Sequence, residues 1–311
     1  MTERFAAPVE LEDALTILAA DAAARPVAGG TDLVVAARQG RASLPVSIVA
    51  IDRIAELATH EIVDGSLVLG ALTTHQWLAS AAEVSGGWTA LADAAAIVGS
   101  PATRGTGTLG GNLMNASPAA ETTGPLVIFD AVATLRTAGG GSRTIPVAEL
   151  ATRPGRTIAS AGELLTRVTV SPLADGSGSA YIRLEYRRAM EIAIVGAAAL
   201  VTMVDGRIVD ARIALTAVAP TIVRAPEAEA SLRDAATGAD AFAAAGRAAA
   251  DHARPIDDVR ASADYRRAML AVVVSRTLAV AAARAAGEAV PVPASRWIAP
   301  PEGSPPLGSP R

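Results

Sequence analysis

A segment of small residues, Gly105 to Glu121, restricts the folds open to this chain. Its seventeen residues include four glycines, two asparagines and several hydroxyl side chains, and none of them is basic. Backbone N–H groups in such a segment can approach a polyphosphate or a sugar closely, because no bulky side chain intervenes. A flexible surface loop is the alternative, but Leu109, Leu113 and Met114 favour packing against a core. The segment is therefore predicted to be packed and shaped by a ligand.

A second loop of small residues lies near the N-terminus, at Ala28-Gly29-Gly30-Thr31-Asp32. The flanking pattern predicts a strand at 25–27, a helix at 33–39 and a strand at 47–51. Amides between a strand and a helix can close around an anion, and the helix N-terminus adds a favourable partial charge. Taken alone, however, the loop favours an ordinary turn with Thr31 or Asp32 as the helix N-cap.

The longer segment also matches the dinucleotide-binding pattern G-x-G-x-x-G. The matching residues are Gly105, Gly107 and Gly110, and Asp130 follows 20 residues after the last of them. That pattern requires a buried strand before it, whereas residues 99–104 read Gly-Ser-Pro-Ala-Thr-Arg. Three later residues are also expected to interrupt any helix leaving the loop, namely Pro118, Gly124 and Pro125. A Rossmann-type dinucleotide-binding protein is therefore only a minor alternative.

The amino-acid composition excludes several classes of enzyme. There is no cysteine, which removes iron–sulfur clusters, thiolate zinc sites, thiol nucleophiles and disulfides. All 27 basic residues are Arg, and without lysine a P-loop ATPase or a pyridoxal enzyme is excluded. The three histidines are scattered, so no metal site is predicted, and the net charge of −4 gives no reason to bind nucleic acid. What remains is a chain that positions a cofactor with chemistry of its own.

The pattern along the chain predicts a mixture of helices and strands. At 311 residues the chain has room for two or three domains of about 100–150 residues each, and aromatics at 3% leave Ala, Val, Leu and Ile to fill their cores. Further helices are predicted at 9–18, 74–83, 88–98, 226–252 and 262–287. A hairpin is predicted at 61–70, and further strands at 131–136, 143–146, 164–170, 180–187, 192–204 and 207–217. Residues 172–179 are the linker candidate.

No segment predicts a membrane span or a signal peptide. The N-terminus carries acidic residues where a signal peptide needs an apolar stretch. The longest strongly apolar run, Ile192 to Val204, has thirteen residues, against about 20 for a helix that crosses a bilayer. We expect a soluble, cytoplasmic protein.

Taken together, the two loops resemble a known family. Ala28 to Leu33 and Thr108 to Asn112, at their distance along the chain, look like the FAD-binding medium subunit of the xanthine dehydrogenase and aerobic carbon monoxide dehydrogenase family of molybdenum hydroxylases. The approach to the second loop, residues 99–107, is similar as well. The resemblance covers nearly the whole chain, including residues 162–166, 181–195 and 261–267.

The resemblance implies an α+β fold of the PCMH or vanillyl-alcohol-oxidase type. An FAD-binding domain at 1–175 would hold FAD between two subdomains, at about 1–57 and 58–175. A C-terminal domain of the CO-dehydrogenase-flavoprotein type at 180–290 would add a three-stranded antiparallel sheet and helices. Residues 291–311 would form a Pro-rich tail.

The resemblance also implies which residues contact FAD. The pyrophosphate would lie against Ala28, Gly29, Gly30, Thr31, Asp32 and Leu33, and against Thr108, Leu109, Gly110, Gly111 and Asn112. Ser117 is a further candidate by its hydroxyl. Glu121 would bind a ribose or adenine-side hydroxyl, and Leu165 would contact adenine through its backbone. Arg183 stands where the family often has Lys, and Ile192 would lie against the isoalloxazine. No catalytic residue is assigned.

The implied activity is electron transfer by one oxidoreductase subunit of a larger complex. A partner's [2Fe–2S] centre would reduce FAD, and electrons would leave to NAD⁺, oxygen or another acceptor. The molybdenum cofactor would lie on a separate large subunit, in a dimer of heterotrimers. FAD is expected to bind non-covalently, since the chain has no Cys and neither loop contains His. The alternatives are a self-sufficient flavin oxidase of the PCMH type and a non-catalytic nucleotide-binding module.

Overall fold

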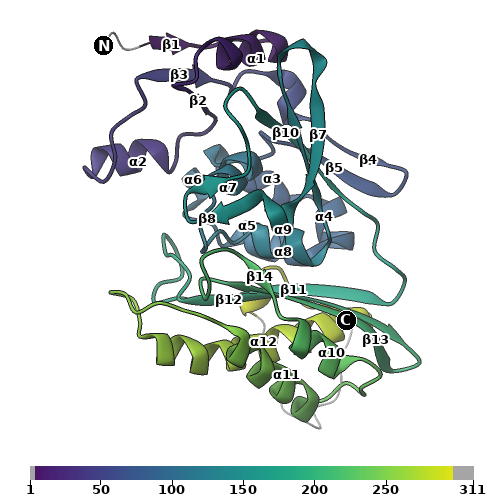
Figure 1. The fold of residues 1–311 in the computed structure, drawn as a ribbon. Helices are drawn as coiled ribbons and strands as arrows, with labels where there is room; N and C mark the ends of the chain where they lie inside the picture. The colour runs from purple at the N-terminus through teal and green to yellow at the C-terminus, as the bar shows by residue number, and fades with distance from the viewer. Residues whose placement is uncertain (1–3, 297–311) are drawn as a thin grey trace.

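A small parallel sheet begins the chain and carries the first glycine loop (Figure 1). The computed structural model describes residues 4–296, so the predicted tail from residue 297 onward lies outside the described residues. The sheet order is β1–β3–β2, with β1 at Arg4–Ala6, β2 at Ala24–Val27 and β3 at Ser47–Ala50. Helix α1 (Leu11–Ala20) buries Leu11, Leu15 and Leu18 on one face at helical spacing. Helix α2 (Leu33–Arg38) connects β2 to β3 in the predicted order of strand, helix and strand, and the two strands are parallel.

A five-stranded antiparallel sheet forms the second subdomain. Its order is β4–β5–β10–β6–β7, and the predicted hairpin is β4 (His60–Val63) with β5 (Ser66–Gly70). The other strands are β6 (Val132–Arg136), β7 (Ser142–Pro146) and β10 (Leu164–Val170). Helices α3 (His75–Ser80), α4 (Ala82–Gly87) and α5 (Thr89–Ala96) follow β5. Smaller elements are η1 (Ala55–Ala58), η2 (Ala138–Gly140), α9 (Val147–Leu150) and the hairpin of β8 (Ala151–Arg153) with β9 (Arg156–Thr157).

The segment of small residues is partly helical. It begins with the last two residues of α6 (Pro101–Thr106) and contains α7 (Leu109–Met114), and residues 115–122 then form turns that lead to α8 (Thr123–Ile128). Leu109 and Leu113 are buried in the core. The prediction that Gly124 and Pro125 would break a helix here is wrong, because both lie in the first turn of α8. The N–H groups of a first turn have no partner within the helix, so proline loses nothing there.

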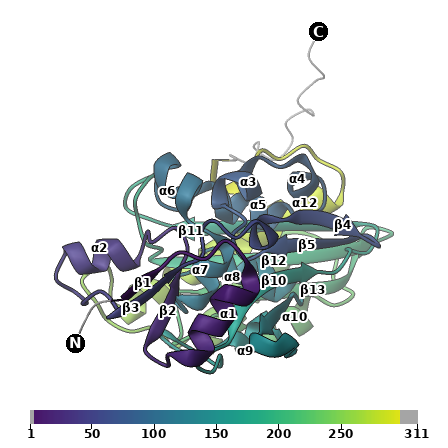
Figure 2. The ribbon, with the colours of Figure 1, turned by 90° about the horizontal axis from the view of Figure 1, so that it is seen from above.

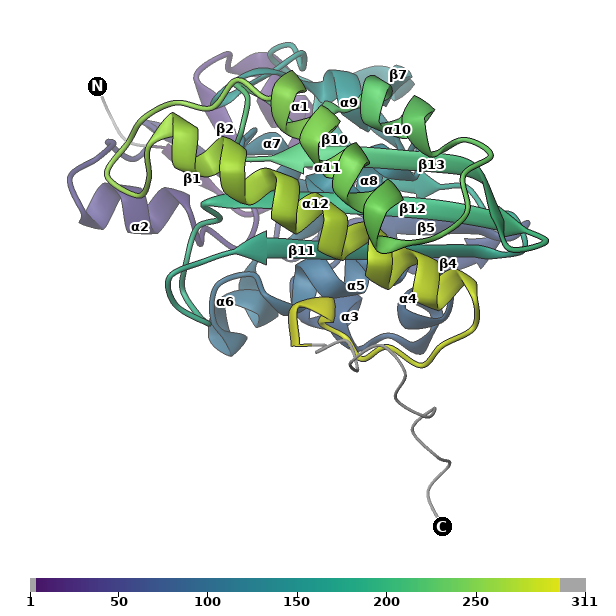
Figure 3. The ribbon, with the colours of Figure 1, turned by 90° about the horizontal axis from the view of Figure 1, so that it is seen from below.

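The C-terminal domain is an antiparallel sheet with helices on its outer face (Figure 3). Its strands are β11 (Ser177–Leu184), β12 (Val195–Val204), β13 (Arg207–Thr216) and the two-residue β14 (Val223–Arg224), which adds a fourth strand to the three predicted. The helices are α10 (Pro226–Leu232), α11 (Ala239–His252) and α12 (Ala263–Ala285), and η3 (Ala294–Arg296) follows them. The predicted single helix 226–252 is interrupted because Asp234 has a positive φ of 60° and donates its backbone N–H to Ile208 at 2.8 Å.

Both faces of this sheet are buried, which explains why β12 consists almost entirely of apolar residues. Ala198 and Leu200 belong to the core shared with the five-stranded sheet and its helices. Ala197, Ala199 and Val201 belong to the core beneath α11 and α12. Side chains alternate between the two faces of a strand, so a strand covered on both faces needs apolar residues at every position. Figure 1 shows the stack of layers from the parallel sheet to α11 and α12, and Figure 2 looks down that stack from the side of the parallel sheet.

Helix α12 is long and apolar enough, by length and composition, to cross a membrane. Its sequence contains no long uninterrupted apolar run, because Arg276 and other polar residues lie among the apolar ones. Half of its most apolar window is buried, and the helix lies along the outer face of the sheet (Figure 3). Packing against β11 and β12 therefore accounts for its composition.

A buried ion pair joins the two domains. The Asp93 carboxylate, in α5, accepts bonds from Arg284 of α12 at 2.7 and 3.0 Å. It also accepts the backbone N–H groups of Tyr181, at 3.1 Å, and Ala294, at 2.8 Å. Neither Asp93 nor Arg284 has more than 6% of its side chain exposed. One carboxylate thus holds α5, β11, α12 and the segment after α12 together.

We expect Asp93→Asn to lower the free energy of unfolding by about 3–5 kcal/mol, because the charge of Arg284 would stay buried without its partner. Urea denaturation of the purified chain measures this loss. The matched control is Asp264→Asn, which removes an ion pair with Arg267 in which Asp264 is 91% exposed. Equal losses in the two variants would show that the buried pair does not hold the domains together.

Candidate cofactor-binding site

The two predicted loops lie against each other. A Cβ atom at Gly29 would be 1.9 Å from the carbonyl oxygen of Thr106, so only glycine permits the approach. A Cβ at Gly107 would lie 3.5 Å from the hydroxyl of Thr31. A side-chain bond adds to this contact, since the Asn115 amide donates to the Asp32 carboxylate at 3.2 Å. Residues about 80 positions apart in the chain therefore form one junction between the subdomains.

The first loop presents unused hydrogen-bond donors. Within the described part of the chain, the N–H groups of residues 28–33 donate to no acceptor. Gly30 has a φ of 65°, which turns the backbone so that successive amides can face one side. Asp32 is the N-cap residue of α2, but its side chain makes no capping bond and instead accepts from Asn115. The ordinary capped turn is therefore not what the structure contains.

The second loop uses its donors internally. The N–H groups of Leu109 and Gly110 donate to Thr73 and Ala71 at 2.9 and 2.8 Å. Thr108 caps α7, since its hydroxyl accepts from Gly111 at 3.1 Å. A Cβ at Gly110 would lie 2.7 Å from the carbonyl oxygen of Ala71, so this glycine permits close packing on residues 71–73. The loop is thereby fixed. The side-chain amide of Asn112 is a further donor, and its oxygen accepts from the Thr122 hydroxyl at 2.7 Å.

Glu121, in the turn before α8, and Arg183, in β11, form a buried ion pair. Arg183 also bonds Glu185, with 2.6 Å between its Nε and the carboxylate. Burial raises the pKa of the Glu121 carboxyl, the charge of Arg183 opposes that rise, and the charge of Asp32 adds to it. The influence of Asp32 on Glu121 means that this pair lies within electrostatic reach of the first loop.

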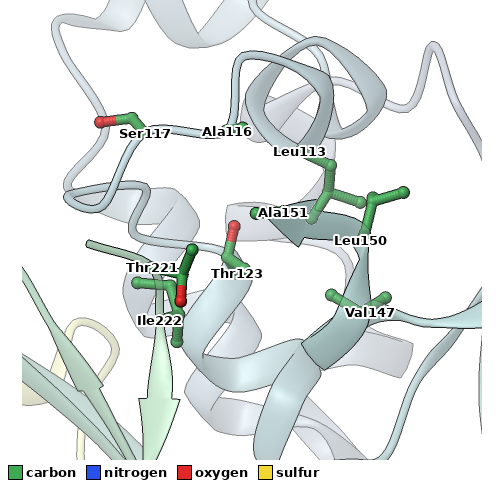
Figure 4. Close-up of a pocket in the computed structure, with 9 residues that line it drawn as sticks. All are labelled: Leu113, Ala116, Ser117, Thr123, Val147, Leu150, Ala151, Thr221 and Ile222. Carbon is green, nitrogen blue, oxygen red and sulfur yellow. The ribbon is translucent and has the colours of Figure 1, made fainter. Parts of the chain in front are cut away.

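The other predicted residues lie around this junction. Ser117 accepts the Ala119 N–H at 3.2 Å and lines a narrow pocket that Thr221 and Ile222 close from the C-terminal domain (Figure 4). Leu165 is buried in β10 at an irregularity in its pairing with β6. Ile192 is exposed on the connection from β11 to β12. The backbone of Met190 ties that connection to Gly99, at 3.1 Å, just before α6.

Some contacts of the site were not predicted from the sequence. Asn115, Thr122 and Glu185 each bond a predicted residue, and His75 lies beneath the second loop. Asn115, Thr122 and Glu185 are each close in sequence to a predicted residue, which was the available signal. His75 carries no local pattern that points to the site. Among the described residues, no group of three or more His, Asp or Glu side chains is placed to hold a metal ion.

Two family models match the chain. Residues 1–173 match the FAD binding domain in molybdopterin dehydrogenase, and residues 179–281 match the CO dehydrogenase flavoprotein C-terminal domain. The chain belongs to this family of FAD-binding medium subunits. It is an oxidoreductase flavoprotein subunit, and the expected α+β fold is confirmed. The Rossmann alternative is wrong, because α6 rather than a strand enters the second loop.

Relatives are similar over most of their length. Subunit alpha of the 6-hydroxypseudooxynicotine dehydrogenase complex of Paenarthrobacter nicotinovorans is 36% identical, over 84% of this chain and 88% of its own. The carbon monoxide dehydrogenase medium chain of Hydrogenophaga pseudoflava is 30% identical, over 91% of this chain and 98% of that medium chain. A structure of carbon monoxide dehydrogenase from that organism, lacking the Mo-pyranopterin moiety, gives a TM-score of 0.86 at 31% identity. The match covers 91% of this chain and 98% of the chain in that structure. The structure of quinoline 2-oxidoreductase of Pseudomonas putida 86 gives a TM-score of 0.85 at 28% identity. The match covers 92% of this chain and 98% of the chain in that structure.

The junction of the loops fits FAD, the cofactor of this family. The pyrophosphate is a dianion, and the unused amides of residues 28–33 are donors suited to it. No basic side chain occurs in either loop, so backbone donors would carry the binding. The second loop supports the first at Gly29 and adds polar side chains.

We expect Gly29→Ala to weaken FAD binding by at least about tenfold. The added methyl must push the first loop away from Thr106, and each charge-assisted bond lost from the cradle costs about 1.5–3 kcal/mol. Flavin fluorescence titration of the purified chain measures the affinity. The matched control is Gly105→Ala, in α6, where a Cβ meets nothing within 4 Å. If both variants bind FAD like the wild type, the close approach at Gly29 does not shape the cradle.

Proposed function

We propose that this chain is the electron-transferring FAD subunit of a three-subunit molybdenum hydroxylase. The observation that carries the proposal is the array of unused amides at residues 28–33, held against the second loop at Gly29. FAD supplies both one-electron and two-electron redox chemistry when it is bound. The chain itself contributes binding, orientation and shielding.

In this proposal the first loop binds the pyrophosphate. The amides of residues 28–33 donate to its oxygens, and the hydroxyl of Thr108 and the amide of Asn112 add side-chain donors from the second loop. Because residues 109–112 are hydrogen-bonded within the chain, the second loop acts mainly as a rigid support. A rigid support lowers the entropy lost when the cofactor binds.

The C-terminal domain covers the other side of the cofactor in this proposal. Arg183 and Glu121 hold β11 against the FAD-binding domain, and Glu121 keeps a carboxylate oxygen available for a ribose hydroxyl. The connection from β11 to β12 brings Ile192 toward α6 through the bond of Met190 to Gly99. An exposed apolar side chain there suits contact with the flat isoalloxazine ring.

The partners follow from what the chain lacks. It has no cysteine, so an iron–sulfur centre that delivers electrons must belong to another subunit. Support comes from the relatives, which include a dehydrogenase complex subunit and the medium chain of carbon monoxide dehydrogenase. We propose an iron–sulfur small subunit and a molybdenum-cofactor large subunit, with NAD⁺ or another acceptor taking the electrons.

FAD should bind without a covalent bond. No cysteine exists to attach it, and neither loop contains histidine. Precipitation of the purified flavoprotein with acid is expected to release all of the yellow colour into the supernatant. Flavin absorbance that stays with the protein pellet would contradict this.

The tagged chain, purified from its native host, should carry iron, molybdenum and FAD together with two further chains. Elemental analysis, flavin absorbance and mass spectrometry of the purified sample measure this. Substrate oxidation should be lost when the partners are removed, since this chain holds only the flavin step. A single chain that carries FAD, holds neither metal and still oxidises an organic substrate would favour the self-sufficient oxidase instead.

A further inference from the structure

The connection from β11 to β12, residues 185–194, is the part of the C-terminal domain that carries Ile192. Its base is closed by the N–H of Ile194, which donates to the last residue of β11 at 2.9 Å. Further along the connection, the N–H of Met190 donates to Gly99 at 3.1 Å, across the boundary between the domains. The exposed Ile192 lies between these two bonds along the chain. The position of Ile192 therefore depends on how firmly the base of the connection is held.

Arg266 is a buried cation that reaches this base from the start of α12. Only 2% of the residue is exposed. Its guanidinium donates to the carbonyl of Ile194 and, at 3.3 Å, to the carbonyl of Ala217, just after β13. Its second terminal nitrogen bonds the carboxylate of Asp258 at 2.7 Å, in the connection from α11 to α12. The planar fork of donors on one arginine thus joins three segments of the chain.

Two further bonds tie these segments together. The N–H of Ala217 donates to the carbonyl of Pro118 at 2.8 Å, in the FAD-binding domain. Ala217 has a φ of 63°, a conformation that a residue other than glycine keeps only when its surroundings hold it. The hydroxyl of Tyr186 donates to the carbonyl of Arg260, which joins the two connections a second time. Arg266 thus lies where both connections approach the FAD-binding domain.

Stability alone is a poor reason to bury a guanidinium at this place. Burial removes the hydration of the charge, and an apolar side chain would fill the same space without that loss. What arginine adds is a fixed arrangement of the groups that it bonds. The groups bonded by Arg266 are two carbonyls at the end of the sheet and one carboxylate, so their arrangement sets where the connection 185–194 begins and ends.

We propose that Arg266 is the positioning residue that holds the connection 185–194, and with it Ile192, over the flavin. The inference rests on the proposed function, because it takes Ile192 to contact the isoalloxazine ring. Arg266 does not touch FAD in this proposal. It acts through the carbonyl of Ile194 and the carboxylate of Asp258.

The first measurement needs no cofactor. Trypsin cleaves after arginine, and the connection contains Arg187 and Arg188. In the FAD-free, full-length chain, cleavage at these two sites, identified by mass spectrometry, should be about tenfold faster in Arg266→Leu, since losing a hydrogen bond to a charged group shifts local opening by about that factor. Cleavage after Arg153 and Arg156, in the hairpin of β8 and β9, is the internal reference and should keep its wild-type rate.

The second measurement uses the chain in excess over FAD, so that all of the flavin is bound. Iodide should quench the flavin fluorescence more strongly in Arg266→Leu than in the wild type, because release of the connection uncovers the isoalloxazine. FAD affinity should stay within about threefold of the wild type, because Arg266 bonds to none of residues 28–33. If the leucine variant does not fold, Arg266→Lys serves instead. It keeps a charge beside Asp258 without the fork, and both changes should appear to a smaller degree.

Arg267→Leu is the matched control, because Arg267 is the adjacent arginine and pairs with Asp264, which is 91% exposed. It should behave like the wild type in both measurements. Wild-type cleavage after Arg187 and Arg188 in a folded Arg266→Leu chain, or an equal rise at the reference sites, would overturn the inference. Faster cleavage with unchanged quenching would overturn it too, since the connection would then not cover the flavin.

These results would leave the proposed function intact. A wild-type chain that binds no FAD would instead overturn the proposed function, and this inference with it.

Discussion

The contact of Gly29 with the Thr106 carbonyl is the constraint around which the site is built. A Cβ at this position would lie 1.9 Å from that oxygen, so the two subdomains can meet only where a side chain is absent. The contact holds the unused amides of residues 28–33 beside a second loop in which the amides of residues 109–112 are already bonded within the chain. One loop is thereby free to bind, and the other is fixed enough to hold it in place.

Two buried ion pairs then set how the C-terminal domain sits on this junction. Asp93 with Arg284 and Glu121 with Arg183 each cross from the FAD-binding domain to the C-terminal one. Buried ion pairs gain little net stability because both charges lose their hydration, but they tolerate few alternative arrangements. Their effect here is to fix orientation, and that orientation brings the connection carrying Ile192 to the start of α6 through Met190 and Gly99.

Local sequence patterns predicted most of the helices and strands. They failed where contacts between distant parts of the chain decide the local conformation. The spacing of apolar residues and the residues at turns predicted two units. These are the strand–helix–strand unit of β2, α2 and β3 and the hairpin of β4 and β5. The failures have physical causes. Pro125 is tolerated in the first turn of α8, and Asp234 leaves the helical conformation to bond Ile208. The small strand β14 has only two residues, too few for any sequence period to reveal.

The sequence by itself determined the chemistry that this chain can perform. Without cysteine or lysine it cannot hold its own iron–sulfur cluster or bind phosphate through an ammonium, and its two loops of small residues were recognisable as a cofactor site. Only the tertiary structure decided which amides stay available, because that depends on whether Ala71 and Thr73 accept those of the second loop. It also brought His75 beneath the loops, since proximity between residues far apart in the chain is created by packing and leaves no local pattern.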